Sequence, residues 1–294
     1  MQPFSDVITK QFNSALFKVN FKHRGEEAVE TINSWVNNRT EGQIPKLFEE
    51  QEEEEKTQLN TLVRMVLLNA VYFRGYWQSP FSLESTKTAT FTLADGTSQV
   101  NVSMMNGRAS VAFVDFDDGT LVELPYNREQ FSAYLFLPKE NQPQLLSSAF
   151  TLPSMNLEAR IAGKLAKEKR RKIRLALPKF KLTTSLKLKA TLEALGIEQA
   201  FRENEANFTR LTGVTSGPER LYLSEVLHRT ALEINESGTI ASAVTGGVAA
   251  ASRTLAQPRL IAFNRPFAIF IREKMSSSAA TVTLFAGVIN KPEL

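Results

Sequence analysis

Residues 237–258 form the segment that most limits how this chain can fold, because nearly all of its 22 side chains are small. The segment is long for a connecting loop, and such side chains bury too little apolar surface to build a core. If it is extended, Thr239, Ala241, Ala243 and Thr245 point to one face. A strand with this face can enter a crowded sheet, whereas a lysine or glutamate there would be buried without a partner. The sequence therefore predicts a segment that is competent both as an exposed loop and as an inserted strand.

Apolar periodicity elsewhere in the chain indicates more strands than helices. Strands are predicted at residues 62–73, 120–124, 131–137, 173–180, 221–233, 260–271 and 280–289. The run at residues 62–73 is the most apolar, which is typical of a central strand buried on both faces, and residues 260–271 and 280–289 are also expected in the core. Helices are predicted before residue 15, at residues 25–36, over most of residues 144–167 and at residues 188–195.

Three dipeptides between residues 91 and 137 are turn signals: Asp95-Gly96, Asn106-Gly107 and Asp118-Gly119. They predict antiparallel hairpins in this part of the chain. Because strands outnumber helices and do not alternate with them regularly, the expected fold class is α+β, with large mixed or antiparallel sheets and surrounding helices. Neither a repeat nor a linker is visible, so residues 1–294 are predicted to form a single domain.

Cysteine and histidine usage limits the chemistry that the chain can perform. Zero cysteine excludes disulfides and thiolate nucleophiles, and the two histidines, His23 and His228, cannot form a histidine-rich metal site. No nucleophile, base and orienting group can be nominated together, so we expect neither an enzyme nor a cofactor. The net charge of +4 does not demand nucleic acid or a membrane surface. With no apolar run of about 18 residues and no charged leader at Met1, neither a membrane span nor a signal peptide is expected in this chain.

Motifs along the chain resemble those of one family. In the last third they are Glu233-Ile-Asn-Glu236-Ser-Gly238-Thr239, Asn264-Arg265-Pro266-Phe267, and Leu284-Phe285-Ala286-Gly287-Val288-Ile289-Asn290 followed by Pro292. Upstream they are Asn69-Ala-Val-Tyr72-Phe73-Arg74-Gly75-Tyr76-Trp77, Leu177-Pro178-Lys179-Phe180, Leu195-Gly196-Ile197 and His228-Arg229-Thr230-Ala231. In order and spacing the chain resembles the serpins over nearly its whole length. We expect Met1 to lie inside the family pattern, after its N-terminal helices and a central helix under the main sheet.

The resemblance implies an inhibitor of serine proteases that acts as a suicide substrate, with residues 237–258 as its exposed reactive loop. In the serpin mechanism the protease attacks the scissile bond and forms an acyl-enzyme. The cut loop then inserts into the main sheet and distorts the protease. The implied partner is therefore a serine protease, and the implied location of the protein is extracellular.

The scissile bond is predicted to lie in the region of residues 252–255. Counting forward from the hinge by the usual family spacing reaches Ser252, and counting back from the strand after the loop reaches Leu255. Arg253 is the only charged residue of the loop, and it suits the acidic primary pocket of a trypsin-like protease. We therefore expect cleavage between Arg253 and Thr254, while cleavage at Leu255 would suit a chymotrypsin-like protease.

The resemblance also assigns residues that support loop insertion. The hinge residues are Glu236, Gly238, Thr239, Ala241, Ala243 and Thr245. Asn69 and His228 match positions that hydrogen-bond across the centre of the main sheet, where it must part. Trp77 matches an aromatic residue packed at the top of that sheet, and Lys179 matches the ion-pair partner of Glu236.

Other readings of the same sequence stay open. One is a non-inhibitory serpin-like carrier or chaperone, and another is an inactive, truncated serpin. A basic cluster is a candidate site for a heparin-like polyanion, although we favour a solvated helix end and loop: Lys164, Lys167, Lys169, Arg170, Arg171, Lys172 and Arg174. Four glycosylation sequons begin at Asn38, Asn101, Asn207 and Asn235, and we expect Asn235 to be unused because a glycan there would obstruct the hinge.

Overall fold

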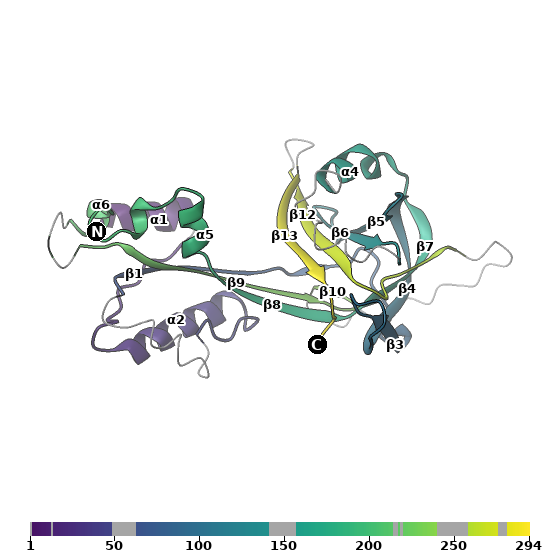
Figure 1. Cartoon of the computed structure of the whole chain (residues 1–294), viewed down its shortest axis with the longest axis horizontal. Helices are drawn as coiled ribbons and strands as arrows, with labels where there is room; N and C mark the ends of the chain where they lie inside the picture. Colours follow the sequence, from purple (N-terminus) through teal and green to yellow (C-terminus); the bar gives the residue numbers. More distant parts are fainter. Residues whose placement is uncertain are drawn as a thin grey trace. The chain divides into compact units, whose positions relative to one another are not determined.

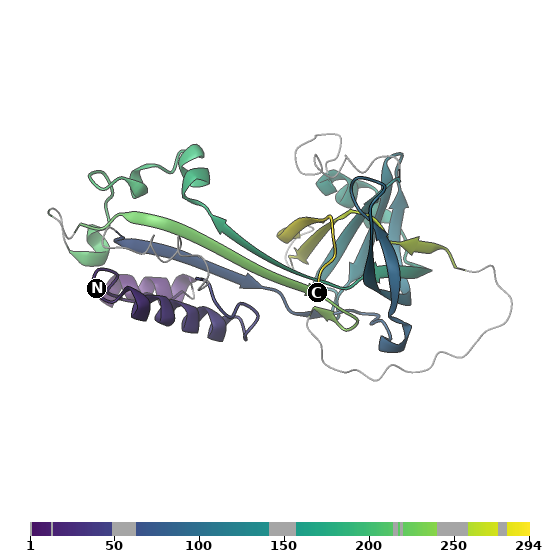
Figure 2. The same ribbon diagram turned by 60° about the horizontal axis from the view of Figure 1, so that its bottom comes forward.

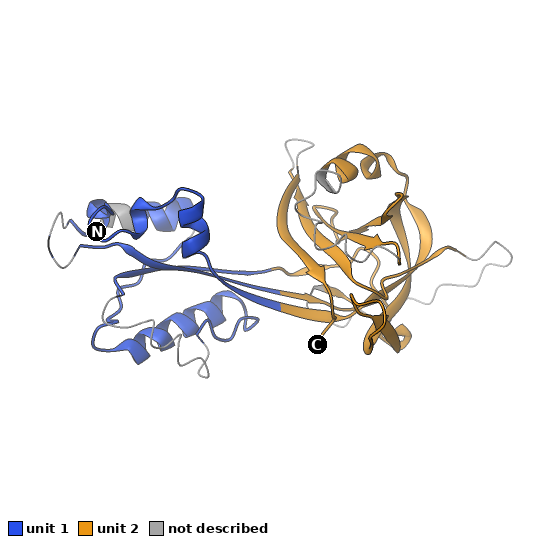
Figure 3. Cartoon of the chain, in the orientation of Figure 1, with its two compact units in different colours: residues 1–72, 183–231 blue, residues 73–182, 232–294 orange. Residues whose placement is uncertain are grey.

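The computed structural model describes residues 2–12, 14–48, 63–140, 157–213, 217, 220–239, 258–275 and 281–294 (Figure 1). They form two compact units, one of residues 1–72 and 183–231 and the other of residues 73–182 and 232–294 (Figure 3). The single domain over residues 1–294 stays a prediction. None of the described helices is long and apolar enough to cross a membrane.

The first unit is built on a three-stranded sheet in the order β1-β9-β8. Its strands are β1 (Met65–Tyr72), β9 (Leu223–Ile234) and β8 (Phe180–Lys187), and the last two extend into the second unit. β1 and β9 run side by side as parallel neighbours, with Met65 opposite Leu223 and Tyr72 opposite Ala231 (Figure 2). The helices are α1 (Gln2–Phe12), α2 (Gly25–Arg39), α5 (Lys189–Ala194) and α6 (Thr209–Thr212), with a short 3₁₀ helix, η5 (Gln199–Phe201).

Helix α2 covers one face of this sheet with a stripe of apolar side chains. Ile32 and Val36, one turn apart, are buried in a cluster that also contains Leu227 of β9. Val66 and Leu68 of β1 pack against the same cluster. The helix predicted at residues 25–36 is therefore confirmed, and it continues for three residues to its end.

β1 is not the central, doubly buried strand that its apolar run predicts. Within the described residues it is the end strand of its sheet, and Leu67 is 54% exposed. Val66 and Leu68 face α2, whereas Leu67 and Asn69 alternate with them and are both exposed. An apolar run shows what a strand is able to bury, but burial needs a covering layer. On the side away from α2, Met65 packs in a cluster with Phe201 and Val226, whereas Leu67 stays exposed.

The second unit is built on a large sheet in the order β11-β7-β4-β5-β6-β12-β13, with β3 paired to β4 beside this path. Its strands are β3 (Lys87–Thr92), β4 (Gln99–Asp115), β5 (Gly119–Pro125), β6 (Phe131–Pro138), β7 (Arg171–Pro178), β11 (Leu260–Ala262), β12 (Phe267–Lys274) and β13 (Thr281–Ile289). The short strands β2 (Gly75–Tyr76) and β10 (Gly238–Thr239) pair separately. The helical segments are η1 (Leu83–Ser85), α4 (Leu157–Gly163) and η4 (Leu165–Lys167).

The two C-terminal strands differ in burial, although both are predicted in the core. The segment predicted at residues 260–271 is divided between β11 and β12. The first six residues of β12 are all buried, as predicted, whereas Leu260 of β11 is 51% exposed. In β13 only Ile289 is buried, and Val282 and Leu284 are 45% and 41% exposed. The prediction is wrong for most of β13, which is the last strand in the order of this sheet.

Two of the three predicted turns are confirmed, and the third is wrong. Asp95-Gly96 separates β3 from β4, and Asp118-Gly119 lies where β4 turns into β5. Asn106-Gly107 lies inside the 17-residue strand β4. A Cβ atom on Gly107 would lie 2.9 Å from the ring of Phe81, so this glycine permits a close approach instead of a turn.

The remaining sequence predictions are largely confirmed. Strands β5, β6 and β7 match those expected at residues 120–124, 131–137 and 173–180, and α1 matches the first helix. Helix α5 ends as predicted before Gly196, whose φ of +90° suits glycine. Helix α4 and η4 occupy the end of the range predicted helical at residues 144–167, of which residues 144–156 lie outside the described residues.

Candidate functional site

The described residues include both flanks of the predicted reactive loop. Residues 240–257 lie outside them, and with them the hinge residues Ala241, Ala243 and Thr245. The four candidates for the scissile bond, Ser252, Arg253, Thr254 and Leu255, also lie outside the described residues. The candidate site is therefore built from the hinge at residues 235–239 and from the groups that hold it.

Gly238 occupies a place in the hinge that only glycine fits. β10 pairs antiparallel with β2, with Gly238 opposite Tyr76 and Thr239 opposite Gly75. The φ of Gly238 is +136°, and a Cβ atom there would lie 2.1 Å from the carbonyl oxygen of Gly75. Reciprocal backbone hydrogen bonds of 2.8 Å and 3.1 Å join Asn235 and Gly238, so the chain reverses its direction directly after β9. The chain therefore turns at Gly238 in a backbone conformation that glycine adopts far more readily than other residues.

Glu236 is a buried carboxylate at the tip of this turn, with 5% of its surface exposed. Its Oε2 lies 3.0 Å from Nζ of Lys179, and its Oε1 accepts a hydrogen bond of 2.8 Å from the hydroxyl of Thr86. Burial alone would raise the pKa of Glu236, but hydrogen bonds from its own amide, Thr86 and Lys179 outweigh burial and hold the pKa below its usual value. The two residues paired by the family resemblance therefore form an ion pair here.

Trp77 holds the other side of the turn. The residue is 2% exposed, its indole N–H donates to the carbonyl of Asn235 at 3.0 Å, and its amide donates to the carbonyl of Ser237 at 2.9 Å. Its ring stacks on Tyr126, with 4.4 Å between the ring centroids and an interplanar angle of 21°. Both hydrogen bonds from Trp77 therefore end on backbone carbonyls of the hinge and do not depend on its side chains.

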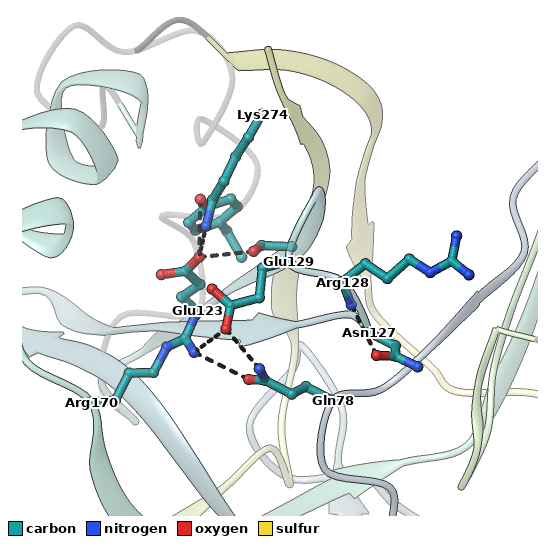
Figure 4. Close-up of polar contacts among 9 residues, drawn as sticks. Gln78, Glu123, Asn127, Arg128, Glu129, Arg170 and Lys274 are labelled. Carbon is teal, nitrogen blue, oxygen red and sulfur yellow. Dashed lines mark hydrogen bonds and ion pairs between the residues drawn. The ribbon is translucent and has the colours of Figure 1, made fainter. Parts of the chain in front are cut away.

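A second polar cluster extends this support beyond Trp77. Arg170 and Gln78, the residue after Trp77, both donate to Oε1 of Glu129, at 2.8 Å and 2.7 Å (Figure 4). These two hydrogen bonds lower the pKa of Glu129 to about 2, and the bond from Arg170 has the larger effect. Arg128 and Glu129 have φ values of +69° and +55°, which are uncommon for residues with side chains. The carboxylate contacts hold this turn in place.

Asn69 and His228 lie directly opposite one another in the paired strands β1 and β9. The Asn69 side chain is exposed and His228 is partly buried. Within the described residues their side chains do not hydrogen-bond to one another, so their role in gating the sheet stays a prediction. His23 is exposed.

The structure divides the predicted basic cluster into two groups. Arg170 and Arg171 are each ion-paired with a glutamate, whereas Lys172 and Arg174 project from β7 and are exposed. The three lysines at residues 164, 167 and 169 are exposed as well. Among the described residues, no group of three or more histidine, aspartate and glutamate side chains is arranged to hold a metal ion.

Sequence reasoning missed several groups that hold the hinge. Thr86 binds Glu236, Tyr126 stacks on Trp77, and Asn235 links the turn to both Trp77 and Gly238. Asn235 is 3% exposed, which agrees with the expectation that its sequon is unused. Only the family motif around Asn235 offered a signal, because contacts between strands distant in the chain leave no periodic pattern.

The sequence of this chain is similar to those of known proteins. The sequence profile of the family described as serpin (serine protease inhibitor) matches residues 1–292. Iripin-8 of Ixodes ricinus is 34% identical over 293 residues, which are 98% of this chain and 67% of Iripin-8. The human leukocyte elastase inhibitor is 31% identical over 288 residues, which are 96% of this chain and 71% of that protein.

Solved structures agree with this assignment. Native protease nexin-1 with heparin superposes with a TM-score of 0.78 at 29% identity, over 99% of this chain and 73% of that one. The complex of thyroxine-binding globulin with thyroxine also gives 0.78, at 26% identity, over 100% of this chain and 72% of that one. The predicted α+β serpin fold is thereby confirmed, and the family is one of protease inhibitors rather than enzymes. The chain belongs to the serpin family.

Proposed function

We propose that this serpin inhibits a trypsin-like serine protease as a suicide substrate. The observation that carries the proposal is the order of strands at the hinge. β10 bonds to Asn235, at the end of β9, and pairs on its other side with β2, which follows β1 after two residues. If the loop after β10 entered the sheet, it would pair with β9 on one side and with β1 on the other. β10 already lies in this way between Asn235 and β2. This order of strands at the hinge supports the proposed insertion.

The energetics of insertion support the same proposal. β1 and β9 form a parallel pair, and a strand entering between them after the turn at residues 235–238 would run antiparallel to both. Antiparallel pairing is slightly more stable per residue than parallel pairing. Each new backbone hydrogen bond gains about 0.5–1.5 kcal/mol, whereas ordering a residue costs about 1–2 kcal/mol. The balance is close, so small inward side chains at residues 241, 243 and 245 matter because they add no burial penalty.

The chemistry assigned to the loop needs no catalytic group from this chain. The oxygen of the protease serine bonds to the carbonyl carbon of Arg253 and gives up its proton to the protease histidine. The amide bond to Thr254 breaks as the histidine passes this proton to the nitrogen of Thr254, which leaves as an amine. An ester then joins Arg253 to the protease. Insertion of the loop before Arg253 moves this ester away from the released amine. Ser252 and Leu255 are the alternative ester-forming residues.

The carrier reading and the location of the protein follow from the same considerations. Thyroxine-binding globulin is similar to this chain, but a carrier gains nothing from an uncharged, small-residued face along its loop. We therefore favour inhibition over a carrier role. We also propose that the protein acts in the extracellular space, where trypsin-like proteases circulate.

Mixing the protein with trypsin tests the proposal. Inhibition predicts a covalent adduct that survives boiling in detergent, while a carrier or an inactive fragment predicts cleavage near Arg253 without an adduct. The variant Thr245→Arg places a cation on the inward face and should be cleaved without forming the adduct. The variant Ser242→Arg, on the opposite face, is its matched control and should still form it.

A further inference from the structure

The segment of residues 76–78 is bonded on both of its edges, as a strand inside a sheet is. On one edge, the amide of Trp77 donates to the carbonyl of Ser237 in the hinge at 2.9 Å. On the other edge, the carbonyl of Tyr76 accepts a hydrogen bond of 2.6 Å from the amide of Asn127. Adjacent residues of an extended chain direct their backbone groups to opposite edges. Whatever fixes the turn that contains Asn127 therefore also fixes the edge on which the hinge is paired.

Three side chains connect this turn to the segment. Glu129 lies in the turn between β5 and β6, Gln78 ends the segment, and Arg170 comes directly before β7. Oε1 of Glu129 accepts from Gln78 at 2.7 Å and from Arg170 at 2.8 Å, and Arg170 also donates to Oε1 of Gln78 at 3.2 Å (Figure 4). These three residues are called the Glu129 cluster. None of them lies in the motifs that carry the family resemblance, so the family pattern does not account for them.

The backbone of the turn adopts a conformation that its side chains disfavour. Arg128 and Glu129 have φ values of +69° and +55°. In this left-handed region a Cβ atom comes too close to the following carbonyl oxygen. Such residues persist only where their surroundings enforce the conformation, and they are frequent at functional sites. The contacts of the Glu129 side chain are therefore expected to hold the turn that binds Tyr76.

The Glu129 cluster contributes little to the stability of the whole fold. The side chains of Glu129 and Arg170 are 47% and 31% exposed, and exposed ion pairs add little to the free energy of unfolding. Trp77, in contrast, is 2% exposed and stacks on Tyr126. The core around Trp77 should therefore stay packed when the cluster is removed. The cluster is placed to control the position of residues 76–78 rather than the stability of the fold.

We propose that Gln78, Glu129 and Arg170 are positioning residues for insertion of the reactive loop. This inference rests on the proposed inhibitory function. Once an ester joins Arg253 to the protease, two outcomes compete. Insertion carries the ester away, whereas hydrolysis adds water to the ester carbonyl, restores the hydroxyl of the protease serine and leaves a carboxylate on Arg253. Because the cluster keeps residues 76–78 in place as the pairing edge for the hinge, it accelerates insertion and leaves hydrolysis unchanged.

The first test measures the ratio of covalent adduct to cleaved chain after reaction with trypsin. Glu129→Gln should lower this ratio about twofold to fivefold, the range for the loss of one exposed charged pair. Arg170→Gln should give a similar loss, and the double variant should lose no more than either single variant, because both act through one contact. The matched control is Glu205→Gln, which removes an exposed carboxylate 3.0 Å from Arg202 in the first unit and should leave the ratio unchanged. An unchanged ratio in Glu129→Gln would overturn the inference.

The variant Glu129→Gly separates the side chain from the backbone of the turn. Glycine suits a φ of +55°, so this variant relaxes the turn but lacks the carboxylate. The ratio of adduct to cleaved chain should fall as far as in Glu129→Gln. A ratio equal to that of the parent would overturn the inference, because the conformation of the turn alone would then be sufficient.

Hydrogen exchange of the uncut protein tests the cluster independently of inhibition. The amides of Trp77 and Gly238 donate to carbonyls of the hinge. In Glu129→Gln they should exchange about twofold to fivefold faster than in the parent, with no change elsewhere in the second unit. If the parent forms no adduct, the proposed inhibitory function fails, but these exchange rates still decide whether the cluster positions the segment. Unchanged exchange at both amides would overturn the inference, and so would equal acceleration throughout the second unit or the same acceleration in Glu205→Gln.

Discussion

Replacing Lys179 by methionine tests the ion pair that holds the hinge. The variant keeps an apolar stem but removes the ammonium group 3.0 Å from Glu236, whose side chain is 7% exposed while that of Lys179 is 24% exposed. Removing one partner of a buried ion pair costs about 3–5 kcal/mol. Thr86 still donates to the carboxylate, and the ammonium was partly solvated. We therefore expect the free energy of unfolding to fall by about 2–3 kcal/mol.

The chain offers a direct reporter for this measurement. It contains two tryptophans, so Trp35→Phe leaves Trp77, which donates to the hinge, as the only source of tryptophan fluorescence. Urea unfolding is followed for Lys179→Met, Glu236→Gln and the double variant in this background. The double variant should lose about 1–2 kcal/mol less than the sum of the single losses. Losses that add within about 0.3 kcal/mol would refute the reasoning, because the two side chains would then not interact.

The pH dependence of stability gives a second check on the same pair. The folded pKa of Glu236 lies below its usual value, despite burial, because of its hydrogen bonds and Lys179. This carboxylate therefore stabilises the fold above its unfolded pKa of about 4.3, and the contribution is lost as the pH falls through the lower, folded pKa. Lys179→Met removes one cause of the lowering, so acid should destabilise the variant at a higher pH than the parent. Coinciding acid transitions would contradict this account.

Two further variants test other features of the structure. Gly238→Ala places a methyl group 2.1 Å from the carbonyl oxygen of Gly75, so it should break the pairing of β10 with β2 and cost at least about 2–3 kcal/mol in urea unfolding. Its control is Gly163→Ala, where a Cβ atom meets nothing within 4 Å, and stability should not fall. Leu67→Lys should change the unfolding free energy by less than about 0.5 kcal/mol because Leu67 is 54% exposed. Leu68→Lys should cost several times more, since Leu68 packs under α2.

Much of the hinge could be placed from the sequence, because its key residues are rigidly specified by local chemistry. Gly238 stands where a side chain would strike the backbone of β2. The buried carboxylate of Glu236 requires a cation such as Lys179 beside it, and both residues were identified through motifs. A residue whose role allows almost no other side chain has a fixed place in a family motif. Such a residue can therefore be recognised from the sequence.

Other features could not be read because they depend on partners distant in the chain. Tyr126 supports Trp77 by stacking, a contact that many aromatic or aliphatic residues could make, so no motif announces it. Asn106-Gly107 has the composition of a turn, but both residues lie within β4, and the ring of Phe81 lies against that glycine. The error at β1 is the opposite one. Its apolar run predicts burial of both faces, but Leu67 is 54% exposed.

Under the proposed mechanism, the hinge would let insertion begin without a separate nucleation step. Starting a new strand normally requires a turn and the first pair of hydrogen bonds before any later residue contributes, and the entropy of closing that loop must be met first. Here Asn235 and Gly238 already form the turn, and Thr239 already lies opposite Gly75. Each later residue would then add its bonds to an existing strand end. Disrupting the turn should therefore slow insertion far more than an equal loss of stability elsewhere, because it restores the closure step that the native hinge has completed.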